Sequence, residues 1–420
     1  MTLPRTAAAA AIALAAGHAL AQPFVAPGDI VTGWSQFTSG TPTTQPDRTI
    51  ELYDNAGNLK PDSWNQFMGI QSVEWDNTGG IPHNPLGHLI GLDFGATATG
   101  FRLYMYDSGS GWTGTELFNA GAAPGFTGFG LLTSRGGGLS VSPDNTKLAV
   151  AGSDAGQVYI FNYDAGARTI TGAQMTQDLP PALVTGDTSG TTWLDNTTAV
   201  ALSSSGQLVT IDTTAAFLTS TPQLLLPGAG LNASEFTSLA YRSAVSPYLY
   251  ASYSAFTTVT TNNVYVIDPR TTPWTLVAGP IDFATSSNTM REIALGDDGA
   301  LYWTTHGNST QGFSRIHKVT GVTNPASILP NSSVPIAQTT FTSSFNGLDV
   351  AGGIPTPPVC YANCDSSTTA PVLNVADFTC FLQRFAAGES YANCDGSTTA
   401  PVLNVADFTC FLQSFAAGCP

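Results

Sequence analysis

Short apolar runs that alternate with polar residues recur along the middle of the chain and end at turns rich in Gly, Asp, Asn and Pro. This period-two pattern predicts β-strands bounded by tight turns. Six runs share one form, an alternating strand that stops at a polar turn: 48–57, 101–110, 156–166, 206–215, 263–272 and 314–323. Their turn residues lie 48 to 57 residues apart and are Asp54, Asp107, Asp164, Asp212, Asp268 and Thr320.

Several of these runs follow a second alternating run across a turn, as in 142–154, 248–256 and 295–307. Antiparallel four-stranded units that repeat at intervals of about 50 residues are typical of a β-propeller. For residues 22–352 we predict six blades, with seven as the alternative, and we expect 345–352 to supply the strand that closes the ring. A long β-sandwich or a β-helix is also compatible with the pattern.

The pattern changes at the C-terminus, where residues 361–388 and 391–418 are nearly identical and differ at only two of 28 aligned positions. Each copy is a polar loop followed by apolar residues that share one face of a helix. These residues are Phe378, Phe381, Leu382 and Phe385 in the first copy, and Phe408, Phe411, Leu412 and Phe415 in the second. Each copy is too short to fold alone, so we expect the two to pack on each other.

All six cysteines of the chain lie in this C-terminal module, which we delimit as residues 360–420. Six cysteines allow 15 pairings. The repeat symmetry favours Cys364–Cys380, Cys394–Cys410 and an outer pair Cys360–Cys419. The swapped pairs Cys364–Cys410 and Cys380–Cys394 are the symmetric alternative. The predicted fold is therefore mainly β, a propeller followed by a small, disulfide-stapled, two-repeat loop–helix module.

Two tandem loop–helix units with Asn/Asp loops resemble a dockerin. The sequence NCDGSTTAPVLNVADFTCFLQ…FAAGC more narrowly resembles the cysteine-containing dockerin-type modules, ending in Gly-Cys, of secreted proteins of planctomycete-like bacteria. The resemblance covers about 60 of the 420 residues. The resemblance implies EF-hand-like calcium sites and docking onto a cohesin-like surface receptor. The implied calcium ligands are Asn363, Asp365, Asn374 and Asp377, then Asn393, Asp395, Asn404 and Asp407.

Oxygen side chains at alternate loop positions, followed by a carboxylate at a helix start, suit a hard cation such as calcium. The stretch from Asn363 to Asp377 is 15 residues long, whereas an EF-hand loop has 12. A second interpretation makes Asn374 and Asn404 helix N-caps, with Asp377 and Asp407 placed favourably for the helix dipole. The two interpretations are compatible.

The N-terminus predicts export. Residues 1–21 contain Arg5, an Ala-rich apolar run and an Ala-Leu-Ala cleavage site, as a secretory signal peptide does. Residues 353–359 have the Gly/Pro composition of a linker between the propeller and the module. We expect an extracellular or cell-surface protein with no membrane span. Its 29 acidic and 13 basic residues give a net charge of −16, which excludes nucleic acid as a partner.

No complete catalytic motif occurs in the middle domain. Candidate carboxylates for hydrolysis are Glu51, Glu74, Glu116, Glu235 and Glu292, and candidate histidines are His83, His88 and His306. Two hypotheses follow. In the favoured one, the C-terminal module anchors a non-catalytic propeller that binds an unknown glycan or protein. In the alternative, the chain is an anchored extracellular glycoside hydrolase or lyase that acts on polysaccharide.

Overall fold

The computed structural model describes the parts of the chain in which the regular elements lie. These are residues 28–35, 48–60, 64–65, 70–75, 88–94, 101–106, 114–119, 138–151, 158–164, 166–175, 188–203, 205–215, 217–227, 235–255, 262–283, 290–305, 314–330, 332–338, 344–351, 362, 364, 373–387, 392, 394 and 402–417. The predicted signal peptide and the linker lie outside them, as do the boundaries at residues 22, 352 and 360.

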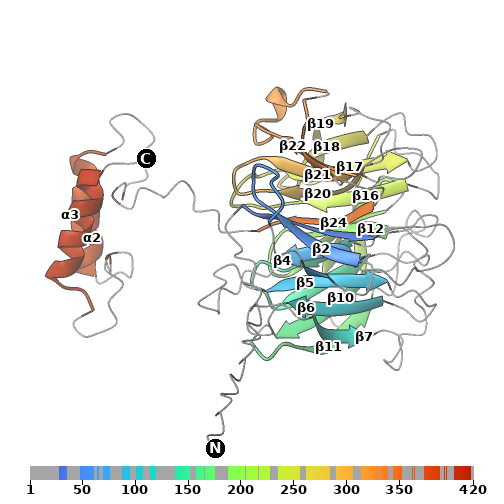
Figure 1. Ribbon diagram of the computed structural model, residues 1–420, viewed down its shortest axis with the longest axis horizontal. Coiled ribbons are helices and arrows are strands. Elements are labelled where there is room, and N and C mark those ends of the chain that lie inside the picture. Colours follow the sequence, from blue (N-terminus) through green and yellow to red (C-terminus); the bar gives the residue numbers. More distant parts are fainter. Residues whose placement is uncertain are drawn as a thin grey trace, which may run out of the picture.

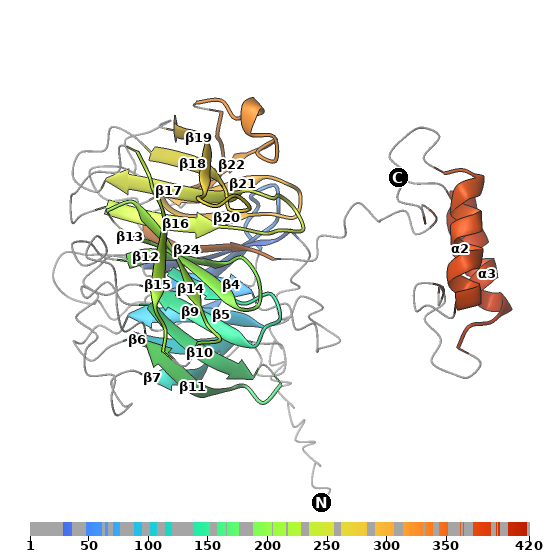
Figure 2. The same cartoon turned by 180° about the vertical axis from the view of Figure 1, so that it is seen from behind.

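The described residues form six antiparallel sheets of four strands each, which are the blades of a β-propeller (Figures 1 and 2). Blade 1 contains β24 (Ser344–Val350), β1 (Ile30–Ser35), β2 (Arg48–Tyr53) and β3 (Trp64–Asn65). Blade 2 contains β4 (Ile70–Trp75), β5 (Leu89–Phe94), β6 (Phe101–Tyr106) and β7 (Thr115–Asn119). Blade 3 contains β8 (Gly138–Val141), β9 (Lys147–Ala151), β10 (Val158–Asp164) and β11 (Thr169–Met175).

The second half of the ring repeats this order. Blade 4 contains β12 (Thr188–Trp193), β13 (Thr198–Ser203), β14 (Gln207–Asp212) and β15 (Ser220–Leu225). Blade 5 contains β16 (Glu235–Ala240), β17 (Leu249–Ala255), β18 (Asn262–Asp268) and β19 (Thr275–Asp282). Blade 6 contains β20 (Met290–Leu295), β21 (Leu301–Thr305), β22 (Arg315–Val319), the short 3₁₀ helix η1 (Pro325–Ser327) and β23 (Val334–Gln338).

The six alternating runs of the sequence are the third strands of the six blades, namely β2, β6, β10, β14, β18 and β22. The accompanying runs in 142–154, 248–256 and 295–307 contain the second strands β9, β17 and β21. The prediction of six blades is therefore confirmed, and seven is wrong. Asp54 and Asp212 show why the runs end there, because each carboxylate accepts backbone N–H groups of the following turn.

Strand β24 closes the ring. It pairs antiparallel with β1, with Ile30 opposite Val350 and Ser35 opposite Ser344. Figure 1 shows β24, in orange, beside the blue strands from the start of the chain. Blade 1 is thus built from both ends of the propeller sequence, as the segment 345–352 predicts.

The propeller core lies between the blades. Each of the six apolar clusters of the described propeller residues joins two neighbouring blades. Between blades 2 and 3, for example, Ile90 and Leu103 pack with Tyr159 and Phe161. Removing this apolar surface from water is the main favourable contribution to the association of the blades.

The C-terminal module contains two α-helices of equal length, α2 (Val375–Ala387) and α3 (Val405–Ala417). Phe381 and Phe411 are fully buried, and their stacked rings lie 4.2 Å apart between centroids. The two repeats therefore pack on each other through equivalent side chains, as their near identity predicts. Disulfides join Cys364 to Cys380 and Cys394 to Cys410, which are the pairs that the repeat symmetry favours.

Candidate functional site

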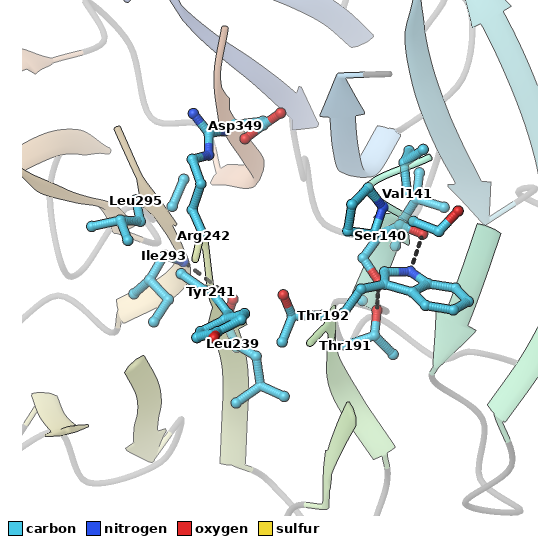
Figure 3. A pocket seen from close by; sticks show the side chains of 18 of the residues that line it. Ser140, Val141, Thr191, Thr192, Leu239, Tyr241, Arg242, Ile293, Leu295 and Asp349 are labelled. Carbon is cyan, nitrogen blue, oxygen red and sulfur yellow. Dashed lines mark hydrogen bonds between the residues drawn. The ribbon is translucent and has the colours of Figure 1, made fainter. Parts of the chain in front are cut away.

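A cavity of about 230 Å³ lies at the centre of the propeller, where five inner strands converge (Figure 3). Its walls come from β8, β12, β16, β20 and β24, and from the turns that follow β8, β12 and β16. Gly190 allows two of these walls to approach, because a Cβ at this position would lie 3.0 Å from the Cα of Ser238. The cavity is therefore a product of ring closure and of small residues on the inner strands.

Buried hydroxyl groups tie the inner strands together around the cavity. The Oγ of Ser140 on β8 donates to the Oγ1 of Thr191 on β12 at 3.0 Å, and Trp193 Nε1 donates to the Ser140 carbonyl at 3.2 Å. The Oγ of Ser238 on β16 accepts the Ile293 N–H of β20 at 3.2 Å. These bonds cross from one blade to the next and fix the shape of the cavity.

Thr192 differs from its neighbours. It is 7% exposed, lines the cavity and points into it from β12 (Figure 3). Its hydroxyl makes no hydrogen bond with another described residue. Because this hydroxyl faces the cavity, it can bond to water or to a ligand there.

Charged residues line the part of the cavity that blades 5, 6 and 1 form. Arg242, after β16, forms a 2.6 Å ion pair with Asp297 and donates from Nη2 to the Val350 carbonyl at 3.3 Å. The Oε2 of Glu292 on β20 accepts the Leu348 N–H of β24 at 2.8 Å. Asp349 is 5% exposed and also lines the cavity. Each of these contacts contributes to the junction where the ring closes.

Tyr241 completes this wall. Its phenol is a hydrogen-bond donor at neutral pH, as any tyrosine is, and burial raises its pKa further. It lies in the turn after β16, next to Arg242, and its side chain is half-buried.

Of the five candidate glutamates, Glu292 alone among those with described side chains lines the cavity. Glu51 accepts a 2.6 Å hydrogen bond from Tyr53, and Glu116 lies on an outer strand beside Arg102. The side chains of Glu74 and Glu235, and the residues His83 and His306, lie outside the described part of the chain. His88 is buried near the hydroxyl of Tyr163, with 3.4 Å between Nδ1 and that oxygen.

The sequence did not single out the hydroxyl-bearing residues of the cavity. Strand β12 reads TSGTTW, and its Ser, Thr and Gly residues have the composition of a loop. The available signal was the position of this segment, two strands before the alternating run 206–215 that forms β14.

The second candidate site is the start of each helix in the C-terminal module. Asn374 Oδ1 accepts the Ala376 N–H at 2.7 Å, and Asp377 Oδ2 accepts the Asn374 N–H at 2.9 Å. Asn404 and Asp407 repeat both bonds at 2.8 Å. Reciprocal bonds of this kind are a capping box, so the N-cap interpretation of these four residues is correct.

Both Asp377 and Asp407 are fully buried, at 0% exposure. The other implied ligands, Asn363, Asp365, Asn393 and Asp395, lie outside the described residues, as does the outer pair Cys360–Cys419. Among the residues that the structure describes, no group of three His, Cys, Asp or Glu side chains is arranged to hold a metal ion. In the same residues, neither helix is long and apolar enough to cross a membrane.

Known structures of similar shape share little sequence with this chain. No protein-family model matches the chain, and no curated protein matches its sequence. Solved structures of similar shape include TolB from Acinetobacter baumannii, with 14% identity, a TM-score of 0.48 and coverage of 77% of this chain and 67% of that one. A putative 6-phosphogluconolactonase from Bacteroides fragilis has 11% identity, a TM-score of 0.43 and coverage of 77% and 98%. A β-propeller domain from Myceliophteria thermophila has 14% identity, a TM-score of 0.37 and coverage of 62% and 70%.

Proposed function

We propose that this chain is an exported binding protein. Its dockerin-like C-terminal module binds calcium and anchors the chain to a cohesin-like or other surface receptor. The β-propeller that it anchors is non-catalytic. The observation that carries the proposal is the duplicated loop–helix unit, in which the first turn of each helix contains a fully buried aspartate, Asp377 or Asp407. The two disulfides are in keeping with an oxidising, extracytoplasmic location.

The described donors suit calcium. Asn374, Asp377 and their twins present only oxygen ligands, which calcium prefers. Burial of an ionised carboxylate has a large desolvation cost unless positive charge or several hydrogen bonds compensate for it. A cation bound between the helix start and the preceding loop would add to the capping bonds that Asp377 and Asp407 already accept.

The module also presents a surface that a receptor can cover. Val375 is 79% exposed and Leu382 is 43% exposed, and both lie on one stripe of α2. Their twins Val405 and Leu412 on α3 are 79% and 41% exposed. Apolar side chains that are exposed at equivalent places in both repeats favour a docking role over a purely structural one.

A calcium titration of the oxidised full-length chain tests the module. We expect calorimetry to show calcium binding and calcium to raise the melting temperature of the module. The double variant Asp377→Asn with Asp407→Asn keeps an oxygen acceptor for each capping bond but removes both charges. It should keep its helices and bind calcium at least tenfold more weakly.

Asp212→Asn is the matched control, because it removes a carboxylate from an exposed turn of the propeller. It should bind calcium as the parent does. Equal calcium affinity in the double variant and the parent would refute the ligand assignment.

A hydrolase or lyase acting on polysaccharide is the second candidate function, because the carboxylates of Glu292 and Asp349 both line the cavity. Glycosidases use a pair of carboxylates across the scissile bond. Against this, Glu292 already accepts the Leu348 N–H that joins blades 6 and 1. Turnover of any glycan by the parent, lost in Glu292→Gln, would establish catalysis and overturn the binding role.

A further inference from the structure

We infer that the central cavity is a binding site for a neutral, polyhydroxylated ligand of monosaccharide size, either a free sugar or the terminal unit of a glycan. This inference rests on the proposed binding role of the propeller and specifies the site and the class of ligand. Four properties of the cavity carry it, namely the hydroxyl of Thr192, the mixture of donors and acceptors, the charge balance and the volume.

The first property is the position of the Thr192 hydroxyl. Thr192 is 7% exposed, and its side chain points into the cavity without a hydrogen bond to another described residue (Figure 3). Its neighbours Ser140, Thr191 and Ser238 direct their hydroxyls into bonds between blades. Thr192 is therefore positioned to bond to an occupant, with which it can act as donor and acceptor.

The second property is the mixture of groups around Thr192. The guanidinium of Arg242 and the phenol of Tyr241 are donors, while the carboxylates of Glu292 and Asp349 are acceptors. Sugar hydroxyls also donate and accept. Val141, Leu239 and Ile293 also line the cavity, and their side chains belong to the apolar clusters between the blades.

Charge argues against an anionic ligand. Among the described residues that line the cavity, Glu292 and Asp349 are carboxylates and Arg242 is the one cation. That guanidinium is already paired with Asp297 at 2.6 Å. A phosphate or carboxylate ligand would meet net negative charge, which disfavours it in a partly enclosed site.

The size of the cavity suits a small ligand. Its volume of about 230 Å³ lies below the roughly 300 Å³ at which typical small-molecule pockets begin. One sugar ring, free or at the end of a glycan, is a ligand of this size.

The test measures sugar binding to the full-length protein by calorimetry and saturation-transfer NMR. The probes are D-glucose, D-galactose, D-mannose, D-xylose and N-acetylglucosamine, each alone and as the terminal unit of an oligosaccharide. We expect at least one of these sugars to bind. Stronger binding of the oligosaccharide would identify a glycan end as the ligand, whereas equal binding would identify the free sugar.

Two variants locate the site. Thr192→Val keeps the shape of the side chain and should weaken binding about tenfold, as expected for one lost hydrogen bond. Ala244→Trp, at an exposed alanine that lines the cavity, should fill its mouth and abolish binding without disturbing the core. Ala56→Trp, at an exposed alanine in the turn after β2, is the matched control and should bind as the parent does.

Absence of binding by every sugar in the panel would overturn the inference, as would undiminished binding in Ala244→Trp. Displacement of the bound sugar by methylammonium or by inorganic phosphate would reassign the cavity to an ion. None of these results bears on calcium binding by the module, which is measured separately. Hydrolysis of the bound glycan would instead keep the site and refute the non-catalytic function.

Discussion

His317 illustrates how the packing between strands controls the chemistry of a single residue. It is 1% exposed and stacks on Trp303, with 4.0 Å between the ring centroids and 14° between the ring planes. Burial, together with the nearby positive charge of Arg315, lowers the pKa of His317 to about 4 from its usual 6.5. The imidazole is therefore neutral in the folded protein at pH 5 to 7.

This shift makes the stability of the propeller pH-dependent. Between pH 6.5 and 4 the unfolded chain binds the proton and the folded chain does not, so stability falls as the pH is lowered. We expect the free energy of unfolding to drop by about 2 kcal/mol from pH 7 to pH 5 through this residue. Denaturant unfolding at the two pH values measures it.

His317→Phe keeps an aromatic ring beside Trp303 and removes the titrating group. The variant should lose this part of the pH dependence while the rest, due to other groups, remains. His88→Phe is a control at a second buried histidine. If His317→Phe and the parent lost equal stability between pH 7 and pH 5, the folded protein would not be excluding the proton from this ring.

At the scale of elements, the sequence predicts the third strands of all six blades, three of the second strands and the ring-closing strand β24, but not the other innermost strands. The third strands β10, β14 and β18 are buried at most of their residues and contain aliphatic and aromatic side chains of the inter-blade clusters. An apolar alternation marks such strands clearly. The outer strands β7 and β15 face water and lack it.

The innermost strand β12 is buried for a different reason. It lies at the crowded centre of the ring, where small side chains such as those of Gly190 and Thr191 fit and hydrogen bonds between blades replace apolar contacts. Such a segment has no hydrophobic period. The place of Thr192 and Arg242 in the cavity is therefore known only from the tertiary structure. The capping role of Asn374 and Asp377, in contrast, can be predicted from their spacing in the sequence.

The disulfides stabilise the helices of the module. Cys364–Cys380 closes a loop with a sequence separation of 16 residues, for which the chain-entropy model gives about 3 kcal/mol. Cys364→Ala with Cys380→Ala should therefore increase hydrogen exchange in α2 by about two orders of magnitude and leave the propeller strands unchanged. The twin variant Cys394→Ala with Cys410→Ala should do the same for α3.

Hydrogen exchange measured by mass spectrometry checks both variants. Because Phe381 of one repeat stacks on Phe411 of the other, part of each effect should spread to the twin helix. Unchanged protection of α2 in the first variant would show that the packing between the repeats, and not the disulfide, holds that helix.

At the scale of the whole molecule, the ring depends on a strand from its far end. Leu348 and Val350 of β24 are 2% and 0% exposed and belong to the cluster that joins blades 6 and 1. A chain that ends at Ser343 lacks this strand, so we expect it to lose cooperative unfolding and to aggregate. A chain that ends at Gly353 keeps β24 and should unfold as the propeller of the parent does.

Calorimetry and light scattering compare the two truncations. Adding a synthetic peptide of residues 344–351 to the shorter chain should restore part of its cooperative transition, because the peptide can pair with β1. Equal melting temperatures in the two truncated chains would show that blade 1 is stable without its innermost strand.

The position of β24 has a mechanical consequence. The last described residue of the propeller, Ala351, directly follows this strand, and the chain continues from there toward the C-terminal module. If that module is held by a receptor, flow or drag on the propeller pulls on β24. The pull reaches Ala351 first, whose carbonyl accepts the Gly28 N–H and whose N–H donates to the Asp29 carbonyl. Val350, which is paired with Ile30, comes next. The strand that completes the ring is then also the strand that bears the load. The largest force that the anchored protein can withstand is therefore the force at which β24 separates from β1 and the ring opens.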